Sequence, residues 1–458
     1  MLSYFSLASA QAPKRSPYRL AGSLRSPVLV AGTRNGTVLQ QILHSLTLLE
    51  APIRLPESSH SLFKGKASSE SVMKAKWVRL DNIRTYAKER IHAIVFDASE
   101  LTRSEDLIAL YQLFHPIIEK LAPGAKVLLT GKPPQDCRSP EAAATQEALQ
   151  GFVRSLAKEV GPKQAATVNL VYLHRPAACD LSSTLAYFLT GASAYVSGQA
   201  ITLQPQHEPV TLENAPLAGK VALITGASQG LGTAIAEVLH AQGAKIIGVD
   251  PEPIRMRLKS VMRSVRGRSL SLDLTSSSAV SSLKDYLVKE DTLLDIVVHT
   301  SALTTDTPLG KLTPAQWSQV LDSHLGRTTR LTGQLLESDL IASQGRIICL
   351  GTLPGLAGQY GQTHHATATA GLSGYIRHLS HHLPAGITAN VVVPGFIESE
   401  WTQTMPFTSR ELSRRLNSLG QGGLPVDIGN AVAYLSHPAS EGVSGQTLRV
   451  CGQNLLGR

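Results

Sequence analysis

The sequence predicts an α/β protein of two tandem, doubly wound domains with parallel sheets. Three observations support this fold class. The 458 residues exceed one ordinary core, strand-like apolar runs alternate with helical patterns, and this pattern restarts halfway along the chain. Because βαβ crossovers are right-handed, we expect helices on both faces of each sheet.

Strand-like and helical runs alternate through the first half of the chain. They are residues 27–32, 92–98, 125–131 and 167–173 for strands, and 105–121 and 147–160 for helices. A polar, proline-containing segment then interrupts the pattern. We therefore expect a basic N-terminal arm at 1–26, a first domain at 27–203, a linker at 204–218 and a second domain at 219–458.

The two halves also resemble each other. The matching pairs are residues 186–203 with 433–450, 151–156 with 374–379, and 125–134 with 345–354. Similarity in the same order along both halves predicts an internal duplication of one domain.

Composition excludes some classes of function. Apolar residues make up 43% of the chain, but no run reaches the roughly 18 residues that a membrane-spanning helix needs. The net charge of +9 favours an acidic partner. The basic stretches at 254–268 and 409–416 lack interleaved aromatic residues, so we expect solvated helix faces and not a nucleic-acid surface.

The four cysteines are far apart and form no CxxC pair, which favours buried, reduced thiols and a cytoplasmic location. The N-terminal segment leaves an alternative. Its first acidic residue is Glu50, and Lys14, Arg15, Arg19 and Arg25 lie in a serine-rich context. This composition also fits a mitochondrial transit peptide.

The strongest motif is TGASQGLG at residues 225–232, between a strand-like run and a helical pattern. Gly226 permits the tight turn, Gly230 lets the backbone approach a pyrophosphate, and Gly232 allows close packing. The N–H groups and dipole of the helix N-terminus favour phosphate. The motif therefore predicts a dinucleotide site.

Asp250 ends the next strand-like run and predicts the cofactor preference. A carboxylate there can accept both ribose hydroxyls and repel a 2′-phosphate, which favours NAD(H). Arg255 and Arg257 lie close by and leave NADP(H) open. In the first domain the matching turn keeps Gly32 and Gly36 but has Val38 in place of the third glycine, so we expect a degenerate scaffold domain there.

The second half resembles the short-chain dehydrogenase/reductases, and the whole chain resembles their long, two-domain 3-oxoacyl-acyl-carrier-protein reductases. The resemblance rests on 225–232, on Asp273 in SLDLT, on PGFIES at 394–399 and on the closing segment 442–453. It implies Rossmann-like domains, reduction of a β-ketoacyl thioester by a nicotinamide hydride, and dimers or tetramers. The positions that it assigns to the cofactor are Thr225, Gly226, Ser228, Gly230, Leu231, Gly232, Asp250, Asp273, Thr300, Pro394, Gly395 and Ile397.

The family's catalytic Asn, Ser, Tyr and Lys fall here at His324, Thr352, His365 and Thr369. In that family Tyr donates the proton, Lys stabilises the Tyr anion and holds the ribose, Ser polarises the ketone and Asn anchors a water. Only Thr352 keeps the required hydroxyl. The family's Asn-Ala-Gly is also replaced, by Thr300, Ser301 and Ala302, and the first copy offers only positions near Ala142 and Gln146.

Two functions stay open. The first is a catalytically impaired protein that binds NAD(H) and serves as a scaffold or partner subunit in fatty-acyl metabolism. The second is an active oxidoreductase in which His365 donates the proton, since a histidine has a reference pKa near 6.5. A metal held by His324, His364 and His365 is disfavoured because no Cys or carboxylate is placed to complete the set.

The resemblance also predicts partners. We expect a β-ketoacyl thioester or acyl carrier protein as substrate, and a homodimer, a homotetramer or a mixed oligomer with an active paralogue. Arg410, Arg414 and Arg415 would suit an acidic carrier or a thioester phosphate, although a solvated helix face explains them equally well.

Overall fold

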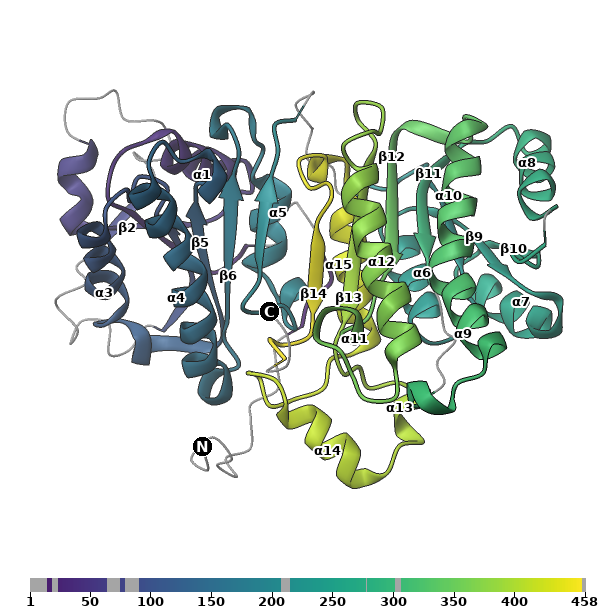
Figure 1. Cartoon of the computed structure of the whole chain (residues 1–458). Coiled ribbons are helices and arrows are strands. Elements are labelled where there is room, and N and C mark those ends of the chain that lie inside the picture. Colours follow the sequence, from purple (N-terminus) through teal and green to yellow (C-terminus); the bar gives the residue numbers. More distant parts are fainter. Residues whose placement is uncertain are drawn as a thin grey trace. The chain divides into compact units, whose positions relative to one another are not determined.

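The computed structural model describes residues 15–18, 24–63, 75–78, 90–206, 215–276, 278–300 and 306–454 (Figure 1). Most of the expected N-terminal arm, part of the expected linker, and Ser301 and Ala302 lie outside these residues. The described chain forms two compact units. Unit 1 consists of the described residues up to Gln206, of Glu411–Gly422 and of the described residues from Cys451 onward. Unit 2 consists of the other described residues up to Val450.

Unit 1 is a seven-stranded sheet in the order β3-β2-β1-β4-β5-β6-β7. Every pair of neighbouring strands is parallel. The strands are β1 Val28–Gly32, β2 Ile53–Pro56, β3 Lys76–Val78, β4 Ile91–Asp97, β5 Leu121–Gly131, β6 Thr167–Leu173 and β7 Ala200–Leu203, and the main helices are α1 Thr37–Leu48, α3 Ile108–Phe114, α4 Pro140–Gln164 and α5 Ser182–Phe188. One face of the sheet packs its apolar residues against α3 and α4.

One helix expected in this unit was wrong. The sequence predicted a single helix over residues 105–121, but α3 ends at Phe114, and β5 begins at Leu121. Pro116 explains the break, because proline has no N–H to donate and crowds the preceding turn of a helix.

Unit 2 repeats the arrangement of unit 1 with the strand order β10-β9-β8-β11-β12-β13-β14, again with parallel neighbours. Its strands are β8 Val221–Thr225, β9 Lys245–Asp250, β10 Arg268–Ser271, β11 Leu294–His299, β12 Ile341–Leu350, β13 Thr388–Pro394 and β14 Thr447–Val450. Its helices are α6 Gly230–Ala241, α7 Arg255–Ser264, α8 Ala279–Lys289, α9 Pro314–Leu321, α10 Arg327–Glu337, α11 Pro354–Ala357, α12 Thr363–Leu379, α13 Glu400–Gln403, α14 Phe407–Arg415 and α15 Pro425–Ser436.

Helices cover both faces of the second sheet. In Figure 1, α10 and α12 lie on the near face and α6 and α15 on the far face. The predicted fold class, two tandem Rossmann-like α/β domains, is therefore confirmed. The carboxyl ends of β8, β9, β11, β12 and β13 meet at one edge of the sheet, which is where ligands bind in such folds.

The duplication extends to individual hydrogen bonds. Asn169 donates to Val196 O over 2.9 Å and accepts from Gln199 N over 3.1 Å. In the second half, Asn390 donates to Val443 O over 2.7 Å and accepts from Gln446 N over 3.0 Å. Each Ser-Gly-Gln segment so held places its glycine at positive φ, +69° for Gly198 and +72° for Gly445.

Two late segments of the chain pack within unit 1. Tyr195 Oη donates to Gln421 O over 3.0 Å, and Gln453 Nε2 donates to Arg154 O over 2.8 Å. Both segments fall within the range 219–458 that the sequence suggested for the second domain, yet they group with unit 1. The other expected domain bounds stay a prediction.

Among the described residues, none of the helices combines the length and the apolar character needed to cross a bilayer.

Candidate active site

The turn between β8 and α6 has the form that a dinucleotide phosphate requires. Gly226 and Gly230 have φ of +66° and +57°, which L side chains rarely adopt. A Cβ on Gly232 would lie 2.0 Å from Gly226 O, so the helix can approach the turn only without a side chain there. With Leu231 half-buried beside it, this cradle fits a pyrophosphate at the helix N-terminus.

Thr225 and Thr300 tie together the ends of two strands beside this turn. Thr300 N donates to Thr225 Oγ1 over 3.1 Å, and Thr300 Oγ1 donates to Thr225 O over 2.6 Å. Thr300 Oγ1 also fills the space where a Cβ on Gly226 would point, at 2.4 Å. Two expected cofactor residues thus support the turn with their own side chains.

Asp250 lies at the carboxyl end of β9, where its carboxylate supports the same turn. Its Oδ2 accepts from Ser228 N over 2.8 Å, and burial raises the pKa of the carboxyl. Arg257 donates from Nε to Ser228 O over 3.0 Å and forms an ion pair with Glu400 at 2.8 Å. The Arg255 guanidinium is paired with Glu252 at 2.9 Å.

Asp273 is exposed in the loop after β10. Its Oδ1 accepts from the backbone and the hydroxyl of Thr275, at 2.9 Å and 2.7 Å, and these bonds lower the pKa of the carboxyl. Arg327, at the start of α10, is close enough to both Asp250 and Asp273 to interact electrostatically. The sequence reading did not single out Arg327.

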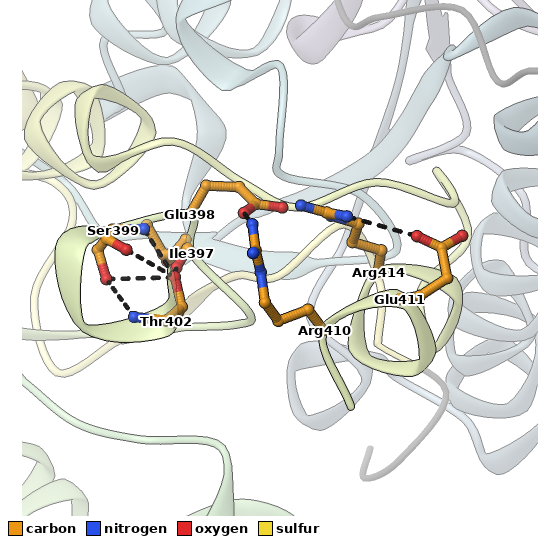
Figure 2. A network of polar contacts seen from close by, with 7 residues as sticks. All are labelled: Ile397, Glu398, Ser399, Thr402, Arg410, Glu411 and Arg414. Carbon is orange, nitrogen blue, oxygen red and sulfur yellow. Dashed lines mark hydrogen bonds and ion pairs between the residues drawn. The ribbon is translucent and has the colours of Figure 1, made fainter. Parts of the chain in front are cut away.

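The loop that follows Pro394 and Gly395 closes on itself (Figure 2). Thr402 Oγ1 donates to Ile397 O over 2.9 Å and accepts from Ser399 N over 2.8 Å. Arg410 NH2 lies 3.7 Å from Glu398 Oε2 in the same view. These contacts hold the backbone at Ile397, an expected cofactor position.

The four positions matched to the family's catalytic residues are brought together. Thr352 Oγ1 and Thr369 Oγ1 are 3.0 Å apart, and Thr369 Oγ1 donates to His365 O over 3.0 Å. The rings of His324 and His365 meet edge to face with centroids 4.5 Å apart. His324 lies in a π-helical turn, Asp322–Gly326, a local irregularity that is frequent at functional sites.

His365 is held by the residue that directly precedes its own helix. Its Nδ1 lies 3.3 Å from Gln362 Oε1, and Gln362 Nε2 donates to Asp306 Oδ1 over 2.6 Å. Burial, with His324 and His364 adding to it, lowers the pKa of His365 to about 4. The imidazole is therefore neutral at pH 7. The sequence analysis missed both residues: Gln362 lies three residues before His365, a spacing that brings side chains together at a helix, whereas Asp306 is 56 residues from Gln362 and no spacing signals it.

A metal centre finds no support in the part of the chain that the structure describes, because no three His, Cys, Asp or Glu side chains there are grouped to hold an ion.

The matching turn in unit 1 differs from that in unit 2. Gly36, the residue before α1, has φ of −93°, and Val38 is buried in the core. Gln146, one of the positions matched to the catalytic helix, donates to Ala98 O and Leu101 O, each over 2.8 Å. Its amide thus serves the backbone of unit 1.

The doubly wound sheet and the glycine-lined turn define a Rossmann-type α/β protein. A family model described as Enoyl-(Acyl carrier protein) reductase matches residues 226–452. The 3-oxoacyl-[acyl-carrier-protein] reductase FabG of Escherichia coli (strain K12) is 34% identical over 235 residues, which are 51% of this chain and 96% of that protein. The chain belongs to the short-chain dehydrogenase/reductase family and is of the 3-oxoacyl-[acyl-carrier-protein] reductase type.

Two further relatives agree. The FabG reductase of Vibrio cholerae serotype O1 is 33% identical over 237 residues, 52% of this chain and 97% of that protein. That of Pseudomonas aeruginosa is 35% identical over 242 residues, again 52% of this chain and 97% of that protein. These relatives match about half of the chain.

Proposed function

We propose that this protein is a reductase-like, nicotinamide-binding member of its family whose ketoreductase chemistry is impaired, and which serves as a scaffold or partner subunit in fatty-acyl metabolism. The observation that carries the proposal is the contrast within unit 2. The glycine turn keeps its cradle, whereas Thr369 lies where the family has its cation and bonds to Thr352 and His365 O. Without a cation there, developing negative charge is poorly stabilised.

NAD(H) is the cofactor that we favour over NADP(H). Asp250 faces the turn with a carboxylate that would repel a 2′-phosphate. The two arginines that left NADP(H) open, Arg255 and Arg257, are paired with Glu252 and Glu400. Bound there, NAD(H) would supply a hydride, while the turn would hold its pyrophosphate and Asp250 its ribose.

A β-ketoacyl thioester, free or on an acyl carrier protein, is the ligand class that the relatives' name suggests. The basic helix α14 gives the carrier little additional support. Arg414 and Arg415 both contact Glu411, at 3.4 Å and 2.7 Å, as a solvated helix face would. A homodimer, a homotetramer or a mixed oligomer with an active paralogue completes the proposal.

The second candidate, an active oxidoreductase with His365 as proton donor, is disfavoured by one observation. A histidine with the reference pKa near 6.5 could donate a proton at neutral pH. Burial, however, lowers the pKa of His365 to about 4. Below 1% of the imidazole is then protonated at pH 7, roughly 3 pH units above that pKa.

A single-turnover experiment tests the proposal. Excess protein is mixed with NADH and a short β-ketoacyl thioester, and NADH oxidation is followed by absorbance. We expect no NADH oxidation by the natural chain, although calorimetry should show that it binds NADH. The double reversion His365→Tyr with Thr369→Lys should oxidise NADH. Turnover by the natural chain would contradict impairment, and absence of NADH binding would contradict the cofactor site.

A further inference from the structure

Two hydrogen bonds determine which ring nitrogen of His365 carries the proton. An ionised carboxylate only accepts hydrogen bonds, so the Gln362 amide, which lies 2.6 Å from Asp306, must turn its NH₂ group toward Asp306. The amide carbonyl then faces the imidazole, with Oε1 at 3.3 Å from Nδ1. Because a carbonyl oxygen cannot donate, His365 Nδ1 must be the donor.

The other ring nitrogen is left as an acceptor. A neutral imidazole has a single N–H, and here it lies on Nδ1. Nε2 of His365 is buried and has no hydrogen-bond partner among the residues that the structure describes. A buried acceptor left in this state is unfavourable, and a ligand donor would remove that penalty.

The hydroxyl pair of Thr369 and Thr352 beside His365 also presents acceptors and not donors. Thr369 uses its only hydroxyl proton on His365 O, at 3.0 Å. In its 3.0 Å contact with Thr352, Thr369 must therefore accept and Thr352 must donate. Thr352 then keeps only lone pairs for a ligand, so Thr352 and His365 offer acceptors and no donor.

We propose that this site recognises a ligand hydroxyl through His365 Nε2 and therefore prefers a 3-hydroxyacyl thioester to the corresponding 3-oxoacyl thioester. A hydroxyl can donate a hydrogen bond to Nε2. A ketone oxygen can only accept, so the lone pairs of two acceptors would face each other. The thioester class rests on the proposed function; the polarity of the site rests on these hydrogen bonds and on the neutral state of the buried imidazole.

Nuclear magnetic resonance of protein labelled with ¹⁵N-histidine tests the polarity without any ligand. At pH 7 we expect a protonated Nδ1 and a bare Nε2 for His365, whose signals are identified by their loss in His365→Phe. In Gln362→Leu the proton should move to Nε2 in a substantial fraction of molecules. Gln359→Leu is the matched control, since Gln359 is exposed three residues earlier on the same loop. Protonated Nε2 in the natural chain would overturn the proposal.

Calorimetry with 3-hydroxybutyryl-coenzyme A, each enantiomer separately, and with acetoacetyl-coenzyme A tests the preference. We expect one hydroxy enantiomer to bind about 5-fold tighter or more than the oxo compound, because a mismatched buried acceptor costs at least about 1 kcal/mol, which is about 5-fold in affinity. The preference should shrink in Gln362→Leu and persist in Gln359→Leu. Equal binding, tighter binding of the oxo compound, or no binding of the hydroxy compounds would overturn the ligand assignment.

These outcomes are separable from those of the proposed function. Failure to bind NADH, or turnover of the β-ketoacyl thioester, would count against the proposed function while leaving the measured position of the His365 proton unchanged.

Discussion

Single residues decide what the nucleotide turn can hold. Gly232 leaves no room for a side chain, since its Cβ would lie 2.0 Å from Gly226 O. Gly333, in contrast, lies in α10 where an added Cβ meets nothing within 4 Å. The same substitution at the two positions should therefore have opposite effects.

We expect Gly232→Ala to abolish NADH binding and to lower the free energy of unfolding by about 1 to 3 kcal/mol, because the helix must move away from the turn. Gly333→Ala should bind NADH normally and be slightly more stable, since alanine favours helix. Calorimetry and chemical unfolding measure both. Normal binding in Gly232→Ala would contradict the close approach as a requirement of the site.

The residue scale also shows the limit of sequence reasoning. The resemblance to the reductase family singled out Thr352, His365 and Thr369, which the structure places after a strand end and on a helix. Their hydrogen bonds could not be predicted, because Asp306 reaches the helix through the fold and not through any sequence repeat. The lowered pKa of His365 likewise depends on burial, which the letters HHATAT do not reveal.

At the scale of elements, the alternation of strands and helices and the internal duplication could be predicted from the sequence. Each element keeps the spacing of its apolar residues, and the two halves present their elements in the same order. The end of the helix expected over 105–121 was not predicted correctly. The apolar pattern continues past Pro116, but a helical backbone cannot continue through the proline. One feature that the two halves share is the asparagine that holds each Ser-Gly-Gln segment.

We expect Asn169→Ala and Asn390→Ala to destabilise their own units by similar amounts, about 2 to 6 kcal/mol each. Each change leaves one backbone N–H and one carbonyl without their buried partner, at about 1 to 3 kcal/mol apiece. Denaturant unfolding followed by hydrogen exchange assigns each loss to a unit. A difference of more than about 2 kcal/mol between the two variants would contradict an equivalent role.

At the scale of the whole molecule, the return of 411–422 to unit 1 could not be read from the sequence, because the segment lies far beyond the linker. Its contact with α4 is testable. A Cβ on Gly161 would lie 2.4 Å from Ser418 O, whereas a Cβ on Gly151 of the same helix meets nothing within 4 Å.

Gly161→Ala should therefore lower the free energy of unfolding by about 1 to 3 kcal/mol, since the Ser418 backbone must move. Gly151→Ala should raise it by about 0.5 to 1 kcal/mol through helix propensity alone. Equal stabilisation by both substitutions, measured in urea, would show that Ser418 does not contact the helix in solution.

Buried histidines also make unit 2 sensitive to acid. Burial lowers the pKa of His299 to about 4 and that of His437 to about 3. Between pH 6.5 and 4 the unfolded chain binds more protons than the folded one, so stability falls as the pH falls.

His299 alone should account for about 3 kcal/mol of this loss between pH 7 and 4. Chemical unfolding measures the free energy of unfolding across this pH range. Its decrease between pH 7 and 4 should be smaller by about 3 kcal/mol in His299→Leu than in the natural chain. An unchanged slope in His299→Leu would contradict a neutral His299 in the folded state.

The grouping of Glu411–Gly422 and the chain end with the first unit also sets an order of events during synthesis. Residues up to Gln206 leave the ribosome first, yet the segments that complete their packing are made about 200 residues later. At about 5 to 20 residues per second, that delay is about 10 to 40 s. The unit translated first is thus completed last, and until then Tyr195 and the end of α4 lack the partners that Gln421 and Ser418 supply.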